Sequence, residues 1–360
     1  MQVILSASDL TKITRQLQGI AAAYPSRLIR LSELGPVLPP NTVVIADFLA
    51  ARPADMRALK LLNETSECRM TGLVDLENRA QVMQVRELGI FHLIDRKQSI
   101  NAILAELRSR LGDYGQPELD DDVSDAMKAT IRATCATMNE LTSAALAGSP
   151  LPAGLLQRSS REISSAIAAE GVGAWISAVQ QHHSHTFCHT MMVTGHTLQF
   201  ATVLGLTEHE RTSLGFGALV HDLGKVRIPL SILDKPGKLT EEERKLVNLH
   251  PAFGKQILLS CGEVPKDVYE VAVSHHEFLD RTGYPVGLRG EQISRPVRIV
   301  TLCDIYSALT EKRAYKDSYS PRQAFSIMAD MGSKLDQDLL RTFRDSLLGN
   351  DLGQLRRSAV

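Results

Sequence analysis

Short apolar runs alternate with longer amphipathic segments over the first 112 residues of the chain. The short runs have the length and the aliphatic content of buried strands, whereas the longer segments repeat apolar residues with the period of a helix. We predict strands at 3–7, 27–31, 42–47, 70–74 and 91–94. We predict helices at 11–23, 53–64, 78–89 and 99–111. This alternation predicts an α/β fold with a small, doubly wound parallel sheet.

The pattern changes at residues 113–122, a polar linker with Gly, Pro and an acidic run. From residue 123 the apolar spacing is helical, and no convincing set of strands follows. An apolar stripe with Ile163 and Ile167, interrupted by GVG at 171–173, is typical of a helix that faces a core. We therefore predict a multidomain chain whose second part is an all-α helical bundle. Its parts are an α/β domain at 1–112, the linker at 113–122 and a helical domain at 123–350, with lead-in helices at 123–180 and a core at 180–347.

Composition narrows the classes of function. Hydrophobic residues make up 44% and charged residues 22% of the 360 positions, and the net charge is -1, which favours neither nucleic acid nor a membrane surface as a partner. The five cysteines are scattered without a CxxC pair, as in proteins that keep reduced thiols. The start MQVILSASDLTK has no basic n-region, and no apolar run approaches the about 18 residues of a membrane span. These features predict a cytoplasmic protein.

Histidine is concentrated in the helical half, where ten of the eleven histidines lie between residues 182 and 276. Several acidic or imidazole groups stand in apolar surroundings: GFGALV precedes His221-Asp222, and RIVTLC precedes Asp304. An unpaired carboxylate is strongly disfavoured there, and ligation of a metal removes that penalty. A lone helical histidine is usually structural, as we expect for His196 and His209. The joint pattern predicts a multi-metal site, because facing helices of a bundle project ligands into one cavity.

Four ordered motifs in this half carry a resemblance to a known family. They are HDLGK (221–225), PLSILDKPGKLTEEERKLVNLHPAFGKQIL (229–258), HHEFLDRTGYPVGLRGEQI (275–293) and DIYSALTEKRAYK (304–316). Residues from about 180 to 347 resemble an HD-GYP domain, a subgroup of the HD metal-dependent phosphohydrolases. The resemblance covers nearly half of the chain.

The resemblance implies a centre of two divalent metal ions, with Fe or Mn as the first choices. Asp222 is the natural bridging ligand. His185 stands where some family members carry a glutamate that helps to hold a third metal, so a third ion and a role for His185 stay open. The positions that match the family's ligands are His189, His221, Asp222, His250, His275, His276 and Asp304.

The family's typical reaction is hydrolysis of cyclic di-GMP to pGpG, and in some members onward to GMP, by attack of a metal-bridging hydroxide. With Asp222 at the catalytic centre, the resemblance implies that Lys225 reaches a phosphoryl oxygen or the leaving group. It implies substrate contacts for Tyr284, Arg313 and Lys316, the last two through phosphate. Two departures stand out: Arg281 replaces a glycine of the usual DGxGYP, and Ala314 replaces the proline of RPYK.

Two other functions remain open at this point. One is a non-catalytic module that senses a cyclic dinucleotide or docks a partner, and the other is an HD hydrolase of a different cyclic dinucleotide, such as cyclic GMP-AMP. Degenerate members are expected to lose ligands, whereas this chain has a match at all seven ligand positions. The complete set favours chemistry over mere binding.

The front domain resembles the receiver domain of response regulators. Asp47 ends the third predicted strand, where receivers carry the phosphorylated aspartate. The surrounding positions are incomplete: Asp9 supplies at best one of two magnesium acids, Asp75 falls where Ser or Thr is expected, and Lys97 comes two residues late. Phosphoryl charge on Asp47 would be poorly neutralised. We therefore predict a pseudo-receiver, with Asp47 as a vestigial phosphoacceptor, that serves a homodimer or contact with signalling proteins.

Overall fold

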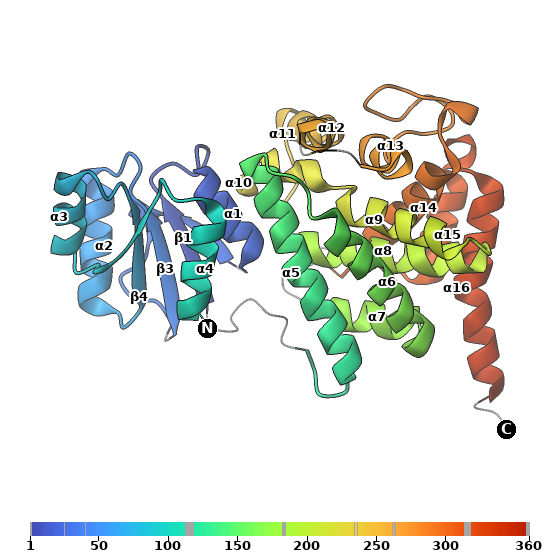
Figure 1. The fold of residues 1–360 in the computed structure, drawn as a ribbon, viewed down its shortest axis with the longest axis horizontal. Helices are drawn as coiled ribbons and strands as arrows, with labels where there is room; N and C mark the ends of the chain where they lie inside the picture. The colour runs from blue at the N-terminus through green and yellow to red at the C-terminus, as the bar shows by residue number, and fades with distance from the viewer. Residues whose placement is uncertain are drawn as a thin grey trace. The chain divides into compact units, whose positions relative to one another are not determined.

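The fold is that of a computed structural model (Figure 1), which describes residues 2–24, 26–39, 41–111, 119–181, 185–233, 235, 237–260, 262, 264–312 and 318–357. The chain divides into two compact units. One unit holds residues 1–116 together with 142–147 and 228–235, and the other holds the remainder. This division into an α/β part and a helical part confirms the predicted fold class.

The first unit is built on a parallel sheet of five strands in the order β2-β1-β3-β4-β5. Each predicted strand forms, with ends within one residue of the prediction. Every residue of β3 is buried, as expected for the central strand of a sheet that is covered on both faces. The strands are β1 (Gln2–Ala7), β2 (Ser26–Arg30), β3 (Thr42–Asp47), β4 (Arg69–Val74) and β5 (His92–Asp95).

Helices cover both faces of this sheet (Figure 1). Successive residues of a strand point to opposite faces, so Leu5 packs with α1 and α4 whereas Ile4 packs with α2 and α3. The predicted helices form as α1 (Arg15–Ala23), α2 (Pro53–Thr65), α3 (Arg79–Glu87) and α4 (Ile100–Leu111), and a short 3-10 turn, η1 (Leu31–Glu33), joins β2 to β3.

Asp47 is buried at the end of β3, and both of its carboxylate oxygens are bonded. Thr14 Oγ1 donates to Oδ2 over 2.7 Å, the Leu49 N–H donates to Oδ1 over 2.9 Å, and the Arg96 guanidinium lies 3.2 Å from Oδ1. Lys97 lies instead 3.1 Å from Asp75. The cation next to Asp47 is thus an arginine that the sequence comparison with receivers did not single out.

Replacing Arg96 by methionine is expected to destabilise the first unit. The side chain of Asp47 is 2% exposed, so the variant leaves a buried charge without its counter-ion, which costs about 3 kcal/mol. Urea denaturation measures this as a lower midpoint. Arg30→Met is the matched control, since the Arg30–Glu33 pair is exposed and its loss costs little. Equal midpoints for the two variants would show that Arg96 does not stabilise Asp47.

Beyond residue 119 the described chain is helical. The predicted interruption at GVG is confirmed, because α6 ends at Glu170 and Gly171 has φ +89°. Within the described residues the only pairing of extended backbone here is an isolated bridge between Asp280 and Arg289. No helix of the described chain combines the length and apolar character that a membrane crossing requires. The helices are α5 (Asp125–Ala147), α6 (Ala153–Glu170), α7 (Val172–Val179), α8 (His185–Val203), α9 (Glu208–Val220), α10 (Leu230–Leu233), α11 (Glu241–Val247), α12 (His250–Ser260), α13 (Lys266–Ser274), α14 (Arg295–Thr310), α15 (Pro321–Asp330) and α16 (Gln337–Arg357), with 3-10 turns η2 (Leu223–Arg227), η3 (Gly290–Gln292) and η4 (Gly332–Lys334).

The core of this region lies where α8, α9 and α14 pack together with α15 and α16. Phe200, Tyr306 and Phe343 form a cluster of ring contacts inside it. His196 is buried in the same cluster, edge-on to Tyr306, and is therefore the structural histidine that the sequence predicted. The same helices carry His189 and Asp304, and α9 leads directly into His221.

Candidate metal centre

The seven predicted ligands come from helices that are far apart in the sequence but meet at one place. His189 is in α8, His221 and Asp222 directly follow α9, and Asp304 is in α14. His250 begins α12, and His275 and His276 follow α13. All except His276 are buried, and the side chain of His276 is 26% exposed. The structure thus brings all seven side chains together, most of them at helix termini.

Backbone carbonyls orient three of the imidazoles. The Nδ1 atoms of His221, His250 and His275 lie 2.7, 2.8 and 3.1 Å from the carbonyl oxygens of Ala218, Val247 and Val271. A carbonyl can only accept a hydrogen bond, so each Nδ1 carries the proton. Each Nε2 is then left with its lone pair turned toward the cluster, the arrangement that is typical of metal-ligating histidines.

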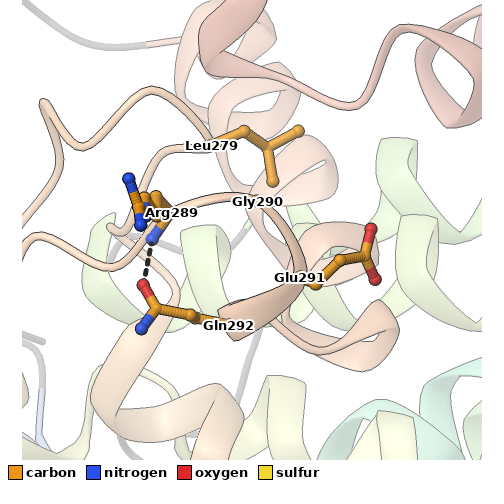
Figure 2. A pocket seen from close by; sticks show the side chains of 5 residues that line it. All are labelled: Leu279, Arg289, Gly290, Glu291 and Gln292. Atoms are coloured by element: carbon orange, nitrogen blue, oxygen red, sulfur yellow. Dashed lines mark hydrogen bonds between the residues drawn. The ribbon is translucent and has the colours of Figure 1, made fainter.

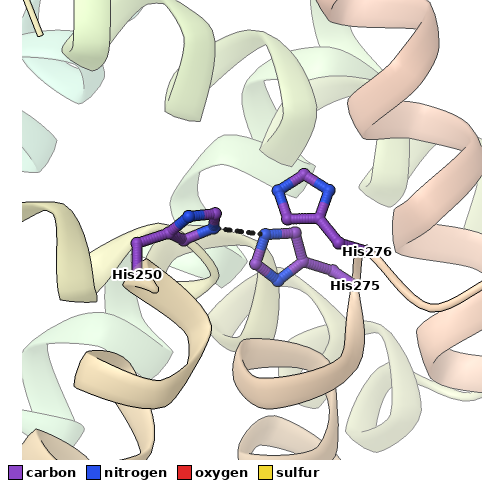
Figure 3. A group of neighbouring side chains, drawn as sticks. All are labelled: His250, His275 and His276. Atoms are coloured by element: carbon purple, nitrogen blue, oxygen red, sulfur yellow. Dashed lines mark hydrogen bonds between the residues drawn. The ribbon is translucent and has the colours of Figure 1, made fainter. Parts of the chain in front are cut away.

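Asp222 is the acid around which these lone pairs converge. Its Oδ2 lies 3.3 Å from His221 Nε2, and its Oδ1 lies 3.3 Å from His250 Nε2 and 4.0 Å from His275 Nε2. Figure 3 shows the rings of His250 and His275 pointing at each other, with their Nε2 atoms 3.2 Å apart. Two neutral lone pairs at that distance repel, and a cation that both ligate removes the repulsion. The donor set therefore fits a divalent metal ion.

Asp304 organises a second part of the cluster. Its Oδ1 lies 2.9 Å from His189 Nε2, and its Oδ2 lies 3.8 Å from His276 Nδ1. Ligand atoms of His189, His221 and Asp304 all lie within 4.8 Å of one another, and so do those of His221, Asp222 and His275. His221 belongs to both groups. Nitrogen and carboxylate oxygen donors of this kind suit Fe, Mn, Zn or Ni.

Burial and neighbouring charges set the protonation states of the cluster. Burial lowers the pKa of His250 to about 4 and that of His275 well below its usual value, so both imidazoles are neutral near pH 7. Burial alone would raise the pKa of Asp222, but the positive charge of Lys225 beside it holds that pKa well below the ordinary range. The two effects together leave neutral nitrogens beside an ionised carboxylate, which is the state that binds a cation.

Lys225 lies beside Asp222, with its Nζ 2.5 Å from Oδ2. It belongs to the turn η2, whose close approach to α12 depends on Gly224: a Cβ at that position would lie 1.9 Å from the carbonyl oxygen of His250. The side chain of Lys225 is 25% exposed, so Lys225 is partly accessible from solvent while it is bonded to Asp222.

Tyr284 covers the histidine doublet from the loop after α13. Its ring stacks on that of His276, with the centroids 4.7 Å apart and an interplanar angle of 26°. Burial raises the pKa of the Tyr284 phenol, which is therefore neutral. Tyr284, for which the resemblance implies a substrate contact, thus lies beside the cluster.

Arg281, in the same loop, has a backbone φ of +76°. This left-handed conformation costs a non-glycine residue about 1 kcal/mol, which explains why glycine is common there in the family that the motif resembles. Arg281→Gly is expected to raise the free energy of unfolding by about 1 kcal/mol, measured as a higher midpoint of urea denaturation. The control is Arg289→Gly, because Arg289 has φ -140° and gains nothing from glycine. A lower urea midpoint in both variants would show that the backbone conformation of Arg281 costs no stability.

Comparison with known proteins identifies this region. Residues 174–339 match the protein-family model described as HD domain. The helical part of the chain carries an HD domain. A cyclic di-GMP phosphodiesterase of Pseudomonas aeruginosa is 39% identical over 159 residues, which cover 44% of this chain and 38% of the relative. The 3'3'-cGAMP-specific phosphodiesterase 3 of Vibrio cholerae is 35% identical over 191 residues, which cover 52% of this chain and 41% of the relative.

The chain spans about two fifths of the length of these curated relatives. Among solved structures, an HDG"Y"P protein from Bdellovibrio bacteriovorus aligns with a TM-score of 0.50 and 18% identity, over 69% of this chain and 79% of that protein. At this identity the likeness shows the fold alone.

Some predicted residues of the HD domain are not tested by this geometry. Arg313 and Lys316 lie outside the described residues, and so does the side chain of His185, which begins α8. A cavity of about 390 Å³ in the described chain is lined by Leu279 and by residues 289–292. Figure 2 shows these lining side chains. None of the candidate ligands lines it, so this cavity is separate from the metal centre.

Two acidic residues of the HD domain escaped the sequence analysis. Glu311 is buried at the end of α14, with Oε2 3.8 Å from Nδ1 of His189. Glu277 is buried directly after the histidine doublet. In the sequence, Glu311 follows an apolar helix and Glu277 follows a pair of predicted ligands. Neither position by itself reveals what the carboxylate contacts.

Proposed function

We propose that this chain is a metal-dependent phosphodiesterase that hydrolyses cyclic di-GMP to pGpG. The convergence of the Nε2 lone pairs on Asp222 carries the proposal, because it gives a buried, cation-ready site with no other evident use. The names of the relatives from Pseudomonas aeruginosa and Vibrio cholerae support a cyclic dinucleotide as the substrate class.

The two oxygens of Asp222 face different histidines, His221 on one side and His250 on the other. This arrangement suits a carboxylate that is shared by two cations, with His189 and Asp304 completing one position and His275 and His276 the other. We propose Fe or Mn as the ions. When bound, such ions supply Lewis-acid activation of the phosphodiester and of water.

The remaining groups handle the substrate. Lys225 places a positive charge 2.5 Å from Asp222 Oδ2, where it can neutralise charge on a phosphoryl or leaving-group oxygen. Tyr284 offers a neutral, half-buried ring beside the cluster, suited to packing against the substrate. Arg313 and Lys316 are proposed to contact the phosphates.

The second candidate substrate is the hybrid cyclic GMP-AMP, since one relative is named for specificity toward 3'3'-cGAMP. Purified protein, loaded anaerobically with Fe²⁺ or Mn²⁺, is given either dinucleotide, and the products are identified by mass spectrometry. We expect cyclic di-GMP to yield pGpG at the higher kcat/KM. Faster turnover of cyclic GMP-AMP would show that the hybrid is the preferred substrate. Binding of either dinucleotide without any product would contradict the enzyme and favour a sensor or docking module.

The first unit is proposed to act as a pseudo-receiver through dimerisation or contact with a signalling partner. The bonds from Thr14, Leu49 and Arg96 to Asp47 support this, because they occupy the carboxylate that a receiver would phosphorylate. A cytoplasmic location is part of the same proposal, on the basis of the scattered cysteines. Incubation with acetyl phosphate and Mg²⁺ is expected to leave Asp47 unmodified by intact-mass measurement.

A further inference from the structure

The loop that follows the histidine doublet folds back against it. The Tyr284 N–H donates to the carbonyl oxygen of His276 over 3.1 Å. Gly283 allows this approach, because a Cβ there would lie 2.5 Å from both the Cα of Glu277 and the carbonyl oxygen of His276. The start of the loop, at residues 276–278, is therefore in direct backbone contact with its middle.

A buried carboxylate fastens the far side of the same loop. Glu277 is 2% exposed and accepts hydrogen bonds from three successive backbone N–H groups. Its Oε1 lies 2.7 Å from the nitrogen of Val286, its Oε2 lies 2.8 Å from that of Leu288, and Gly287 donates to both oxygens at 3.1 and 3.0 Å. Gly287 has φ +77°, which turns the three N–H groups toward one point. Such a concave set of amides is an anion site, and here Glu277 fills it.

Tyr284 is thus held from both directions. On one side its own N–H is bonded to His276, and on the other the residues that follow Pro285 are bonded to Glu277. The backbone that carries the ring is therefore fastened on both sides of Tyr284, next to His276. Hydrogen bonds to an ionised carboxylate are stronger than neutral ones, so this anchor resists opening more than ordinary loop contacts do.

We propose that Glu277 is a positioning residue that holds Tyr284 against His276 and thereby shapes the substrate side of the metal centre. This inference rests on the proposed function for its catalytic consequence, but the anchoring of the loop is independent of it. Glu277 has no atom among the candidate ligands, so it acts through the loop and not on the substrate.

Hydrogen exchange tests the anchor directly and needs neither metal nor substrate. In Glu277→Gln an amide NH₂ faces amide donors, so we expect peptides that span residues 286–288 to lose protection while those of α13 and α14 keep theirs. Glu291→Gln is the control, because the side chain of Glu291 is 99% exposed. Unchanged protection at 286–288, or global unfolding of both Glu277→Gln and Glu277→Asp, would overturn the local anchor.

A double-mutant cycle tests the link to Tyr284. We expect Glu277→Gln to lower kcat/KM for cyclic di-GMP by about 10- to 100-fold, mainly through KM and with metal content retained. In a Tyr284→Ala background the same change is expected to have little further effect, because the residue it positions is gone. If the double variant loses the product of the two single-variant decreases in kcat/KM, Glu277 does not act through Tyr284. If the unmodified protein turns over no dinucleotide, the proposed function fails, and the exchange result still decides the anchor.

Discussion

Asp222→Ala is expected to remove nearly all turnover and to lower the metal content of the purified protein. The two oxygens of Asp222 serve both sides of the cluster, so the variant removes a shared ligand and leaves His250 and His275 facing each other without a counter-charge. Loss of about 4 kcal/mol of transition-state stabilisation corresponds to about a 10³-fold lower kcat/KM. Elemental analysis and product formation measure the two effects on the same sample.

The control for Asp222 is His209→Ala, because His209 is an exposed histidine in α9, the helix that His221-Asp222 directly follows. Its metal content and turnover are expected to match those of the unmodified chain. An Asp222→Ala protein that keeps both its metal and its activity would remove the basis for placing the ions here.

Lys225→Met is expected to lower kcat while the metal content of the protein stays the same. The methionine keeps the length of the side chain but removes the positive charge that lies 2.5 Å from Asp222. If that charge also stabilises the developing negative charge on the substrate, kcat falls by about 10²- to 10³-fold. The metal content is expected to stay unchanged, because Lys225 is a cation and ligates nothing.

Lys266→Met supplies the matched control, since the side chain of Lys266 is 91% exposed and pairs with Glu270 within the same helix. Steady-state kinetics and elemental analysis are run on both variants. A Lys225→Met protein with normal kcat would show that the ammonium group serves only to balance the charge of Asp222.

The sheet could be predicted closely from sequence because its strands are short and their apolar runs alternate with helical segments. All residues of β3 are buried, so its hydrophobic run ends where the strand ends, at Asp47. The candidate metal ligands could also be predicted from sequence, because an Asp such as Asp304 within an apolar helix requires a compensating partner. In both cases the signal is local in the sequence.

Other features depend on contacts that local sequence does not encode. Glu277 and the amides at 286–288 meet only because the intervening loop returns on itself through Gly283. Arg96 rather than Lys97 reaches Asp47, since the two side chains leave the chain after β5 in different directions. Likewise, the orientation of His275 follows from a carbonyl on the preceding turn. Each requires the path of the backbone, and not only the residue types.

A metal titration tests whether this cluster binds two divalent ions and uses them to hydrolyse a cyclic dinucleotide. Chelator-stripped protein receives Mn²⁺ stepwise under anaerobic conditions, and bound metal and pGpG formation from cyclic di-GMP are measured at each step. We expect no pGpG from the stripped protein and activity that rises to a plateau at two bound ions per chain. Full occupancy without pGpG, or full activity in the stripped protein, would contradict this expectation.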